Sequence, residues 1–382
     1  MTVFSRTDTS LLSDWWWTVD RWLLMALALL IGFGVVMTFS ASPAIAEKLG
    51  LGSFHFAKRQ ILFIIAAMIA MFGVSLLPVQ WVRRLGVTLF LVAVILMVLT
   101  MVIGFEAKGS RRWLSIGSFT LQASEFLKPA FIIFSAWMFS EVHKNPEFRG
   151  WSIAIFSYLI VVTLLISQPD FGQTILVSLV WGAQFFMAGL PMIWVLGLAG
   201  LGMAGVFLAY MLIPHVSDRI DRFLYPEVSD TYQVDTALNA LRSGGIFGRG
   251  PGEGAVKKIL PDAHTDFIFA VTGEEFGVII CLILIGLFAV IVVRSLIRNM
   301  KETDMFVFLA VSGLIIQFGL QAFINLGVNL SVLPSKGMTL PFISYGGSSM
   351  LSMAIAMGMV LALTRRGAGN NLENLNSGWR KS

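Results

Sequence analysis

Long apolar runs, bounded by charged or turn residues, recur about ten times along this chain of 382 residues and constrain its fold more than any other feature. A helix needs about 20 apolar residues to cross the hydrocarbon core of a membrane. The expected spans are 22–42, 57–77, 83–104, 124–142, 152–168, 171–189, 192–213, 267–294, 305–330 and 345–364. The pattern therefore predicts an all-α polytopic membrane protein of about ten transmembrane helices, with both termini on one side.

The composition excludes most other classes of protein. Hydrophobic residues make up 57% of the chain and charged residues only 13%, whereas soluble proteins carry about 25% charged residues. A soluble multidomain enzyme, a nucleic-acid-binding protein and a disordered chain are therefore excluded. The net charge of +5 indicates basic segments beside a membrane rather than a nucleic-acid partner. Because a charge inside a membrane is costly, each such charge is a candidate functional residue.

The spans also set the domain organisation. Residues 22–366 form one transmembrane domain between an N-terminal tail at 1–21 and a C-terminal tail at 367–382. The stretch 214–266, rich in charge and glycine, is the only loop large enough to form a substantial structure outside the membrane. No internal repeat is visible, so an inverted-repeat transporter has no support from sequence symmetry.

Lys and Arg are enriched in the cytoplasmic loops of membrane proteins. In this chain, the number of these residues on each side does not by itself decide the orientation. With the N-terminus inside, 13 of the 27 basic residues lie on the cytoplasmic side. Six of the other 14 lie in the 214–266 loop, and four lie around the start of the fourth helix, at 108–128. Two basic clusters on one face would suit a site for an anionic substrate. The opposite topology stays open on counting alone.

The first segment with candidate chemistry covers 109–113 and 122–128. Ser124 is expected to cap the fourth helix, and Glu125 and Lys128, three residues apart, would share one helix face. One interpretation is a local ion pair at the membrane interface. The other is a phosphate-binding cluster, in which Arg111 and Arg112 supply forked donors and Lys128 a point charge.

The second segment is the glycine-rich stretch 244–254, which is followed by Lys257 and Lys258. Its glycines would let backbone amides approach a phosphate. The spacing matches neither a Walker loop nor a dinucleotide fingerprint, so this stretch taken alone favours a mobile loop over a phosphate cradle.

The third segment, 260–277, places Asp266 where the polar loop meets the eighth helix. Helix capping by Thr265 or Asp266 is one interpretation. The other is a general base, because a carboxylate that is partly removed from water binds a proton more readily. Asp266 and Glu275 are expected to face different sites, since nine residues place them about half a turn out of phase. Glu274 and Glu275 lie in the apolar run and are expected in a structural network.

The fourth segment, 333–349, contains prolines and glycines that break the helix before the last span. Non-helical backbone at membrane depth is tolerated only where it lines protein or a water-filled cavity. We therefore expect a re-entrant segment that walls the same cavity. No zinc-ligand spacing and no Ser-His-Asp arrangement is present in the sequence.

These segments, together with 168–172 (Gln-Pro-Asp-Phe-Gly), resemble the SEDS family (shape, elongation, division and sporulation) of peptidoglycan-polymerising membrane glycosyltransferases. The resemblance covers about 22–366, and the stretches 250–254, 257–258 and 261–264 are similar to the cell-division branch rather than to the elongation branch. Two departures are Ala123, where the family usually has proline, and a 257–258 stretch that is one residue shorter than in many relatives.

The resemblance implies ten transmembrane helices in the bacterial inner membrane, both termini in the cytoplasm and a place at the division septum. It implies polymerisation of lipid II with release of undecaprenyl pyrophosphate, and partnership with a class B penicillin-binding protein and other division proteins. Asp266 matches the family's essential aspartate and is the expected catalytic base. The expected substrate-binding residues are Arg112, Gln122, Glu125, Lys128, Arg249, Lys257, Lys258, His264, Thr265 and Ser344.

A divalent cation, Mg²⁺ or Mn²⁺, is a candidate cofactor with Asp266 as a candidate ligand, and no organic cofactor is expected. Two alternatives remain. A lipid II flippase would use the intramembrane charges of Glu274, Glu275 and Lys128, and a noncatalytic division scaffold would recruit partners through the tails and the 214–266 loop.

Overall fold

The computed structural model describes residues 10–48, 50, 52–107, 110–117, 119–225 and 231–365. The predicted tail at 367–382 lies outside the described residues, as do residues 1–9 of the N-terminal tail. The remainder of that tail includes α1 (Leu11–Thr18), which Ser10 caps by accepting a hydrogen bond from the backbone N–H of Ser13.

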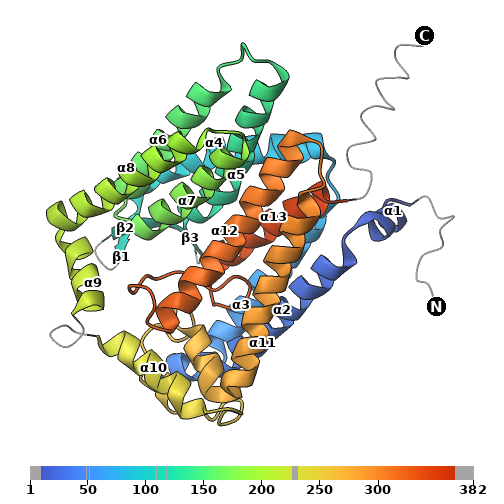
Figure 1. Cartoon of the computed structure of the whole chain (residues 1–382). Helices are drawn as coiled ribbons and strands as arrows, with labels where there is room; N and C mark the ends of the chain where they lie inside the picture. The colour runs from blue at the N-terminus through green and yellow to red at the C-terminus, as the bar shows by residue number, and fades with distance from the viewer. Residues whose placement is uncertain are drawn as a thin grey trace.

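Each of the ten predicted apolar runs falls on a helix of the described part of the chain (Figure 1). These helices are α2 (Arg21–Lys48), α3 (His55–Ser75), α4 (Val79–Ile103), α5 (Ala123–Lys144), α6 (Gly150–Ser167), α7 (Phe171–Met187), α8 (Met192–Leu212), α11 (Ile268–Asn299), α12 (Met305–Asn329) and α13 (Gly347–Leu363). By length and composition, six helices of the described residues could span a membrane, or seven if the bent pair in 200–224 counts as one span. The prediction of a polytopic helical membrane protein is confirmed.

Large apolar side chains on the outer faces of these helices support the same conclusion. Ile69 of α3, Val102 of α4 and Leu196 of α8 are among many that remain exposed on the surface of the isolated chain. An exposed apolar surface of this extent is typical of a protein that contacts lipid.

A small antiparallel sheet between α4 and α5 departs from the all-α prediction. Its strands β1 (Phe105–Ala107), β2 (Ser110–Ile116) and β3 (Phe119–Leu121) pair in the order β1-β2-β3. Aromatic and branched side chains favour strands, and Trp113 of β2 lies opposite Phe105 of β1. The sheet matters for the site because β2 carries Arg112.

The 214–266 stretch folds into short helices, and its predicted place outside the membrane stays a prediction. It contains α9 (Pro214–Leu224), α10 (Tyr232–Gly244) and the short 3₁₀ helix η1 (Val256–Lys258). The chain bends by 104° between 200–212 and 216–224, so that α9 turns away from α8 (Figure 1). The α10 helix packs against α11.

The α11 helix is broken at Gly277, and the glycine-rich segment 245–250 fills the break. Gly277 has φ of 77°, and a side chain there would meet the carbonyl of Ile246, since an ideal Cβ lies 2.3 Å from its oxygen. Four backbone hydrogen bonds of 3.0–3.4 Å replace those that the helix loses: Arg249 and Gly250 donate to Glu274 and Glu275, and Val278 and Ile279 donate to Gly245 and Ile246. This stretch is therefore packed against α11, and two of its amides are used there rather than left to cradle a phosphate.

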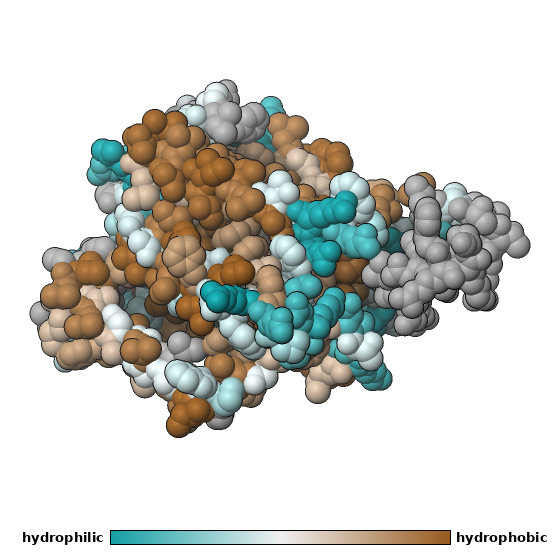
Figure 2. Space-filling view, turned by 90° about the horizontal axis from the view of Figure 1, so that it is seen from above, coloured by the Kyte–Doolittle hydropathy of each residue, from teal (hydrophilic) through white to brown (hydrophobic). Residues whose placement is uncertain are grey.

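One end of the bundle is tied together by arginines. Asp20, just before α2, pairs with Arg298 and, at 3.4 Å, with Arg294, both on α11. Arg298 also donates to the carbonyl of Thr364, and Arg365 donates to Thr18 and Leu76. Seen from above, hydrophilic residues form a patch beside a broad hydrophobic area (Figure 2). The candidate site lies at the opposite end, where α5, α7, α11 and α13 begin.

Candidate functional site

The non-helical stretch between α12 and α13, residues 330–346, confirms the predicted break before the last helix. Asn325 of α12 fixes it by donating from its side-chain amide to the carbonyl of Met338 (2.6 Å) and to that of Asp266 (2.9 Å). The segment 336–339 within this stretch contacts two of the three charged groups described next and is linked to the other through Gln321, and so forms the centre of the site.

Asp266 lies half-buried in a turn before α11. Its carbonyl accepts hydrogen bonds from the side-chain amides of Asn325 and Asn329 (2.9 Å each), and its carboxylate lies beside Gly337, where an ideal Cβ would be 2.8 Å from Oδ2. The interpretation of Thr265 or Asp266 as a helix cap is not supported, because α11 begins at Ile268 after Phe267, without a side-chain cap hydrogen bond. Two α12 amides thus hold the backbone of the expected base.

The predicted residues His264, Thr265 and Ser344 lie together beside Asp266. The Ser344 hydroxyl donates to the carbonyl of Thr265, and the backbone N–H of Tyr345 donates to the carbonyl of His264 (2.9 Å). The His264 ring packs against Tyr345 with ring centres 5.3 Å apart. These contacts join the 262–266 turn to the chain that enters α13.

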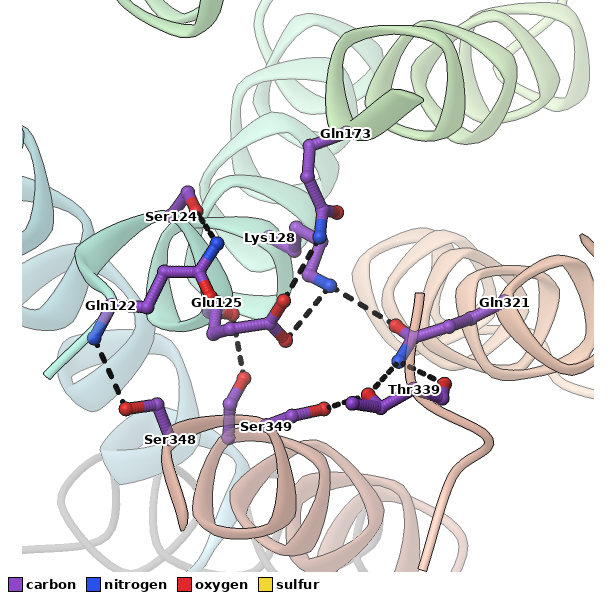
Figure 3. A network of polar contacts seen from close by, with 10 residues as sticks. Gln122, Ser124, Glu125, Lys128, Gln173, Gln321, Thr339, Ser348 and Ser349 are labelled. Atoms are coloured by element: carbon purple, nitrogen blue, oxygen red, sulfur yellow. Dashed lines mark hydrogen bonds and ion pairs between the residues drawn. The ribbon is translucent and has the colours of Figure 1, made fainter. Parts of the chain in front are cut away.

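Lys128 and Glu125 form the second charged group, in which the predicted i,i+3 pair is confirmed (Figure 3). The Lys128 ammonium, in a residue that is 2% exposed, lies 2.9 Å from Glu125 Oε2 and donates to Gln321 Oε1 at 3.0 Å. Gln173 of α7 donates to the other oxygen of Glu125 (2.9 Å), and Gln321 donates to the carbonyl of Thr339 (3.1 Å). Buried charges persist when they are paired in this way.

The start of α5 differs from the prediction, because Gln122 rather than Ser124 occupies the cap position. The backbone N–H of Gln122 donates to the Ser348 hydroxyl (3.1 Å), and its side-chain amide donates to Ser124 at 3.2 Å (Figure 3). The hydroxyl of Ser352 donates to the carbonyl of Glu125. The first turn of α5 is therefore anchored to α13 instead of being capped by its own serine.

Asp170 forms the third charged group, in the turn between α6 and α7. It is 2% exposed and accepts a hydrogen bond from Lys336 Nζ at 2.9 Å, while Arg112 Nη1 lies 3.7 Å away. Arg112 also donates to the carbonyls of Gln168 (3.0 Å) and Pro169. Burial of Asp170 raises the pKa of its carboxyl, but Lys336 and Arg112 outweigh that effect, so the pKa lies below its ordinary value.

Lys257 lies elsewhere, in a buried network that favours a structural role over the predicted substrate contact. Its ammonium pairs with Glu275 and donates to the carbonyls of Ser40 and Gly252 (3.0 Å each). Glu274 accepts from the backbone N–H groups of Val256 and Lys257. The expectation that the two glutamates belong to a structural network, apart from Asp266, is confirmed by these contacts. Lys258 and Arg249 are exposed.

Comparison with known proteins assigns this architecture to a family. Residues 21–368 match the family model named for FtsW, RodA and SpoVE and described as cell cycle protein. The chain belongs to this family. It is the SEDS family that the sequence motifs resembled.

Two curated relatives within the family carry the name probable peptidoglycan glycosyltransferase FtsW. The one from Caulobacter vibrioides is 49% identical over 367 residues, which cover 96% of this chain and 94% of the relative. The one from Trichlorobacter lovleyi is 36% identical over 358 residues, which cover 90% and 93%. Both carry the name of the division branch.

Two solved structures share the fold at 26% identity. A chain in "Structural coordination of polymerization and crosslinking by a peptidoglycan synthase complex" has a TM-score of 0.74, with 92% of this chain and 98% of that chain covered. The rod shape determining protein RodA of Thermus thermophilus has a TM-score of 0.68, with 93% and 99% covered. SEDS proteins thus match this chain over nearly its whole length.

Sequence reasoning assigned no role to Asp170, Lys336, Gln173, Gln321 and Asn325, although all five connect the site. The polar side chains of α12 carried a usable signal, because Gln321, Asn325 and Asn329 recur every four residues in an apolar helix and therefore share one face. The pairing of Lys336 with Asp170 had no such signal, since the two residues lie 166 positions apart in the chain.

Proposed function

We propose that this SEDS protein is a peptidoglycan glycosyltransferase that polymerises lipid II during septal cell-wall synthesis. The observation that carries the proposal is that one segment, 336–339, lies against the carboxylate of Asp266, bonds that of Asp170 through Lys336, and connects to Lys128 through Gln321. The names of the curated relatives, which are glycosyltransferases, support the same reaction.

The proposed reaction is a displacement at the anomeric carbon of the donor saccharide. The 4-hydroxyl of the acceptor GlcNAc attacks that carbon, and its proton passes to the carboxylate of Asp266. The bond to the diphosphate breaks, and undecaprenyl pyrophosphate leaves with the electron pair. Cations near the 336–339 segment stabilise the charge that develops on the leaving group.

The fixed backbone of Asp266 supports its role as the base. Asn325 and Asn329 hold the carbonyl of this residue, and Gly337 leaves room beside its carboxylate. A side chain at 337 would occupy space within 3 Å of that carboxylate. Preorganised groups of this kind contribute to catalysis because they need no rearrangement during the reaction.

A divalent cation, Mg²⁺ or Mn²⁺, stays a prediction. Among the described residues, no three His, Cys, Asp or Glu side chains come together, and Asp170 already faces two cations. Asp266 alone is a poor fit to a dedicated protein site, so no step is assigned to a metal.

The proposed membrane arrangement has ten crossings, with both termini in the cytoplasm and the Asp266 end outside it. The tied end of the bundle supports this orientation, because Arg294, Arg298 and Arg365 lie there beside Asp20 and Thr18. Basic residues at helix ends favour the cytoplasmic side. The description of the family as cell cycle protein supports the proposed place at the division septum.

The proposed partner is a class B penicillin-binding protein that crosslinks the new glycan, with other division-complex proteins nearby. Support comes from the structural neighbour, whose name joins polymerisation to crosslinking in one synthase complex. The flippase alternative has less support, because the three charges that motivated it have partners. Glu274 accepts from backbone amides, Glu275 pairs with Lys257, and Lys128 pairs with Glu125. No observation favours a noncatalytic scaffold.

The test is polymerisation of lipid II by the purified full-length protein with its partner. We expect Asp266→Asn to lower the rate by about 10²–10⁴-fold, as loss of a general base does. Asp218→Asn, at an exposed position of α9, is the matched control and should retain the wild-type rate. Full activity of Asp266→Asn would refute the base assignment, and translocation of lipid II in sealed vesicles without polymerisation would favour the flippase.

A further inference from the structure

The turn at 168–172 helped to identify the family, yet the reaction above gives it no role. Its centre is Asp170, a buried carboxylate with two cations that come from distant parts of the chain. Arg112 lies on β2, and Lys336 lies between α12 and α13. Since three nitrogens of the Arg112 guanidinium face the turn itself, this arginine fixes the place of Asp170.

Gly172, in the first turn of α7, gives Lys336 its path to Asp170. An ideal Cβ on Gly172 would lie 1.8 Å from Cε and 2.2 Å from Nζ of the lysine. Glycine in a helix costs about 1 kcal/mol relative to alanine. Here the missing methyl group is the space through which the lysine side chain crosses the helix.

Lys336 is also directly bonded in sequence to the residue that faces Asp266. Gly337 lies against the carboxylate of Asp266, and Lys336 reaches the carboxylate of Asp170. The two carboxylates therefore flank a single dipeptide. In the proposed reaction, the leaving diphosphate gains negative charge close to the point at which Asp266 receives a proton.

We propose that Lys336 contacts the diphosphate of the lipid-linked substrate, and that Asp170 and Gly172 are positioning residues that set the place of its ammonium. A lysine ammonium is a common phosphate ligand and has three donors, so it can donate to Asp170 and to a phosphate at once. This inference rests on the proposed function, because that function supplies the polyprenyl diphosphate.

The test is equilibrium binding of undecaprenyl diphosphate to the purified full-length protein in detergent. Lys336→Ala and Gly172→Ala should each weaken binding by about tenfold or more, as loss of a charged hydrogen bond does. The double variant should bind as weakly as Lys336→Ala, because Gly172 acts through the lysine. Binding of undecaprenol, which has the same tail without phosphate, should not change.

Two control variants match the test. Lys301→Ala removes an exposed lysine between α11 and α12, and Gly182→Ala fills an open position on α7, where no atom lies within 4 Å of an ideal Cβ. Both should bind undecaprenyl diphosphate like the wild type. The proposal is overturned if Lys336→Ala retains affinity, if undecaprenol binding falls equally, or if the two substitutions add in full.

The outcome is separable from that of the proposed function, because binding requires no turnover. If Lys336→Ala binds undecaprenyl diphosphate normally while Asp266→Asn abolishes polymerisation, only the proposed role of Lys336 is refuted. If the wild-type protein fails to polymerise lipid II but shows the predicted binding pattern, the proposed reaction is refuted and the proposed diphosphate site is supported.

Discussion

Asp20 and Asp170 are two buried carboxylates, at opposite ends of the bundle, that each face two cations. Asp20 is 7% exposed and pairs with Arg294 and Arg298; Asp170 is 2% exposed and faces Arg112 and Lys336. In both, burial raises the pKa of the carboxyl, but the neighbouring cations lower it by more, so that each pKa lies below its ordinary value.

The two clusters differ in where their cations come from. Both cations of Asp20 lie on α11, four residues apart, and the cluster fastens helix ends to one another. The cations of Asp170 come from β2 and from the 336–339 segment, and the second of these is adjacent to Asp266. Similar electrostatics therefore hold helices together at one end and, at the other, fix a lysine whose neighbour in the chain, Gly337, lies beside the candidate base.

The largest expected effect is on polymerisation. Asp170→Asn should lower the rate of lipid II polymerisation by roughly 10–100-fold, because it removes a charged hydrogen bond that positions Lys336. Asp20→Asn should stay within about twofold of the wild-type rate per folded molecule. Glycan product is measured at equal concentrations of folded protein. An equal loss of polymerisation rate in the two variants would contradict the difference in role between the two clusters.

The second effect is on acid stability and should be shared by both clusters. A carboxyl with a lowered folded pKa stabilises the protein above its ordinary pKa of 3.8, and this contribution is lost as pH falls through the folded value. Wild-type stability should therefore decrease below about pH 4, and Asp20→Asn or Asp170→Asn should flatten that decrease. Thermal unfolding in detergent between pH 7 and acid gives the measurement; an unchanged slope in both variants would contradict it.

The smallest effect separates the two arginines of the Asp20 cluster. Arg294 is 44% exposed at its side chain, and Arg294→Met should cost less than about 1 kcal/mol. Arg298→Met should cost more, because Arg298 also donates to the carbonyl of Thr364. Melting temperatures of the two variants compare them directly, and the reverse order would show that the contact with Thr364 contributes little.

The membrane fold could be predicted because it depends on a local property, the apolar run. Every predicted run falls on a helix. The short sheet at 105–121 was missed, since three strands of three to seven residues carry little periodicity. The cap of the fourth predicted helix was also mispredicted: Ser124 has a suitable side chain, but contacts with α13 fix this helix start instead.

The site was predictable only in part, because its residues come from segments far apart in sequence. Glu125 and Lys128 lie within one helical turn, so their pairing could be predicted from the sequence. Lys257 was predicted to bind substrate, since nothing nearby in sequence reveals the burial that it shares with Glu275. No role was predicted for Lys336 from the sequence, because its position depends on Asp170 and on the absence of a side chain at Gly172.

The break in α11 at Gly277 has a consequence for its electrostatics. Hydrogen bonds no longer run through the helix from Ile268 to Asn299, so the peptide dipoles form two shorter arrays in series. The positive start of the second array meets the carbonyls of Gly245 and Ile246, and the negative end of the first meets the amides of Arg249 and Gly250. The amides of the break and of the 245–250 segment should therefore exchange their hydrogens with solvent as one cooperative unit.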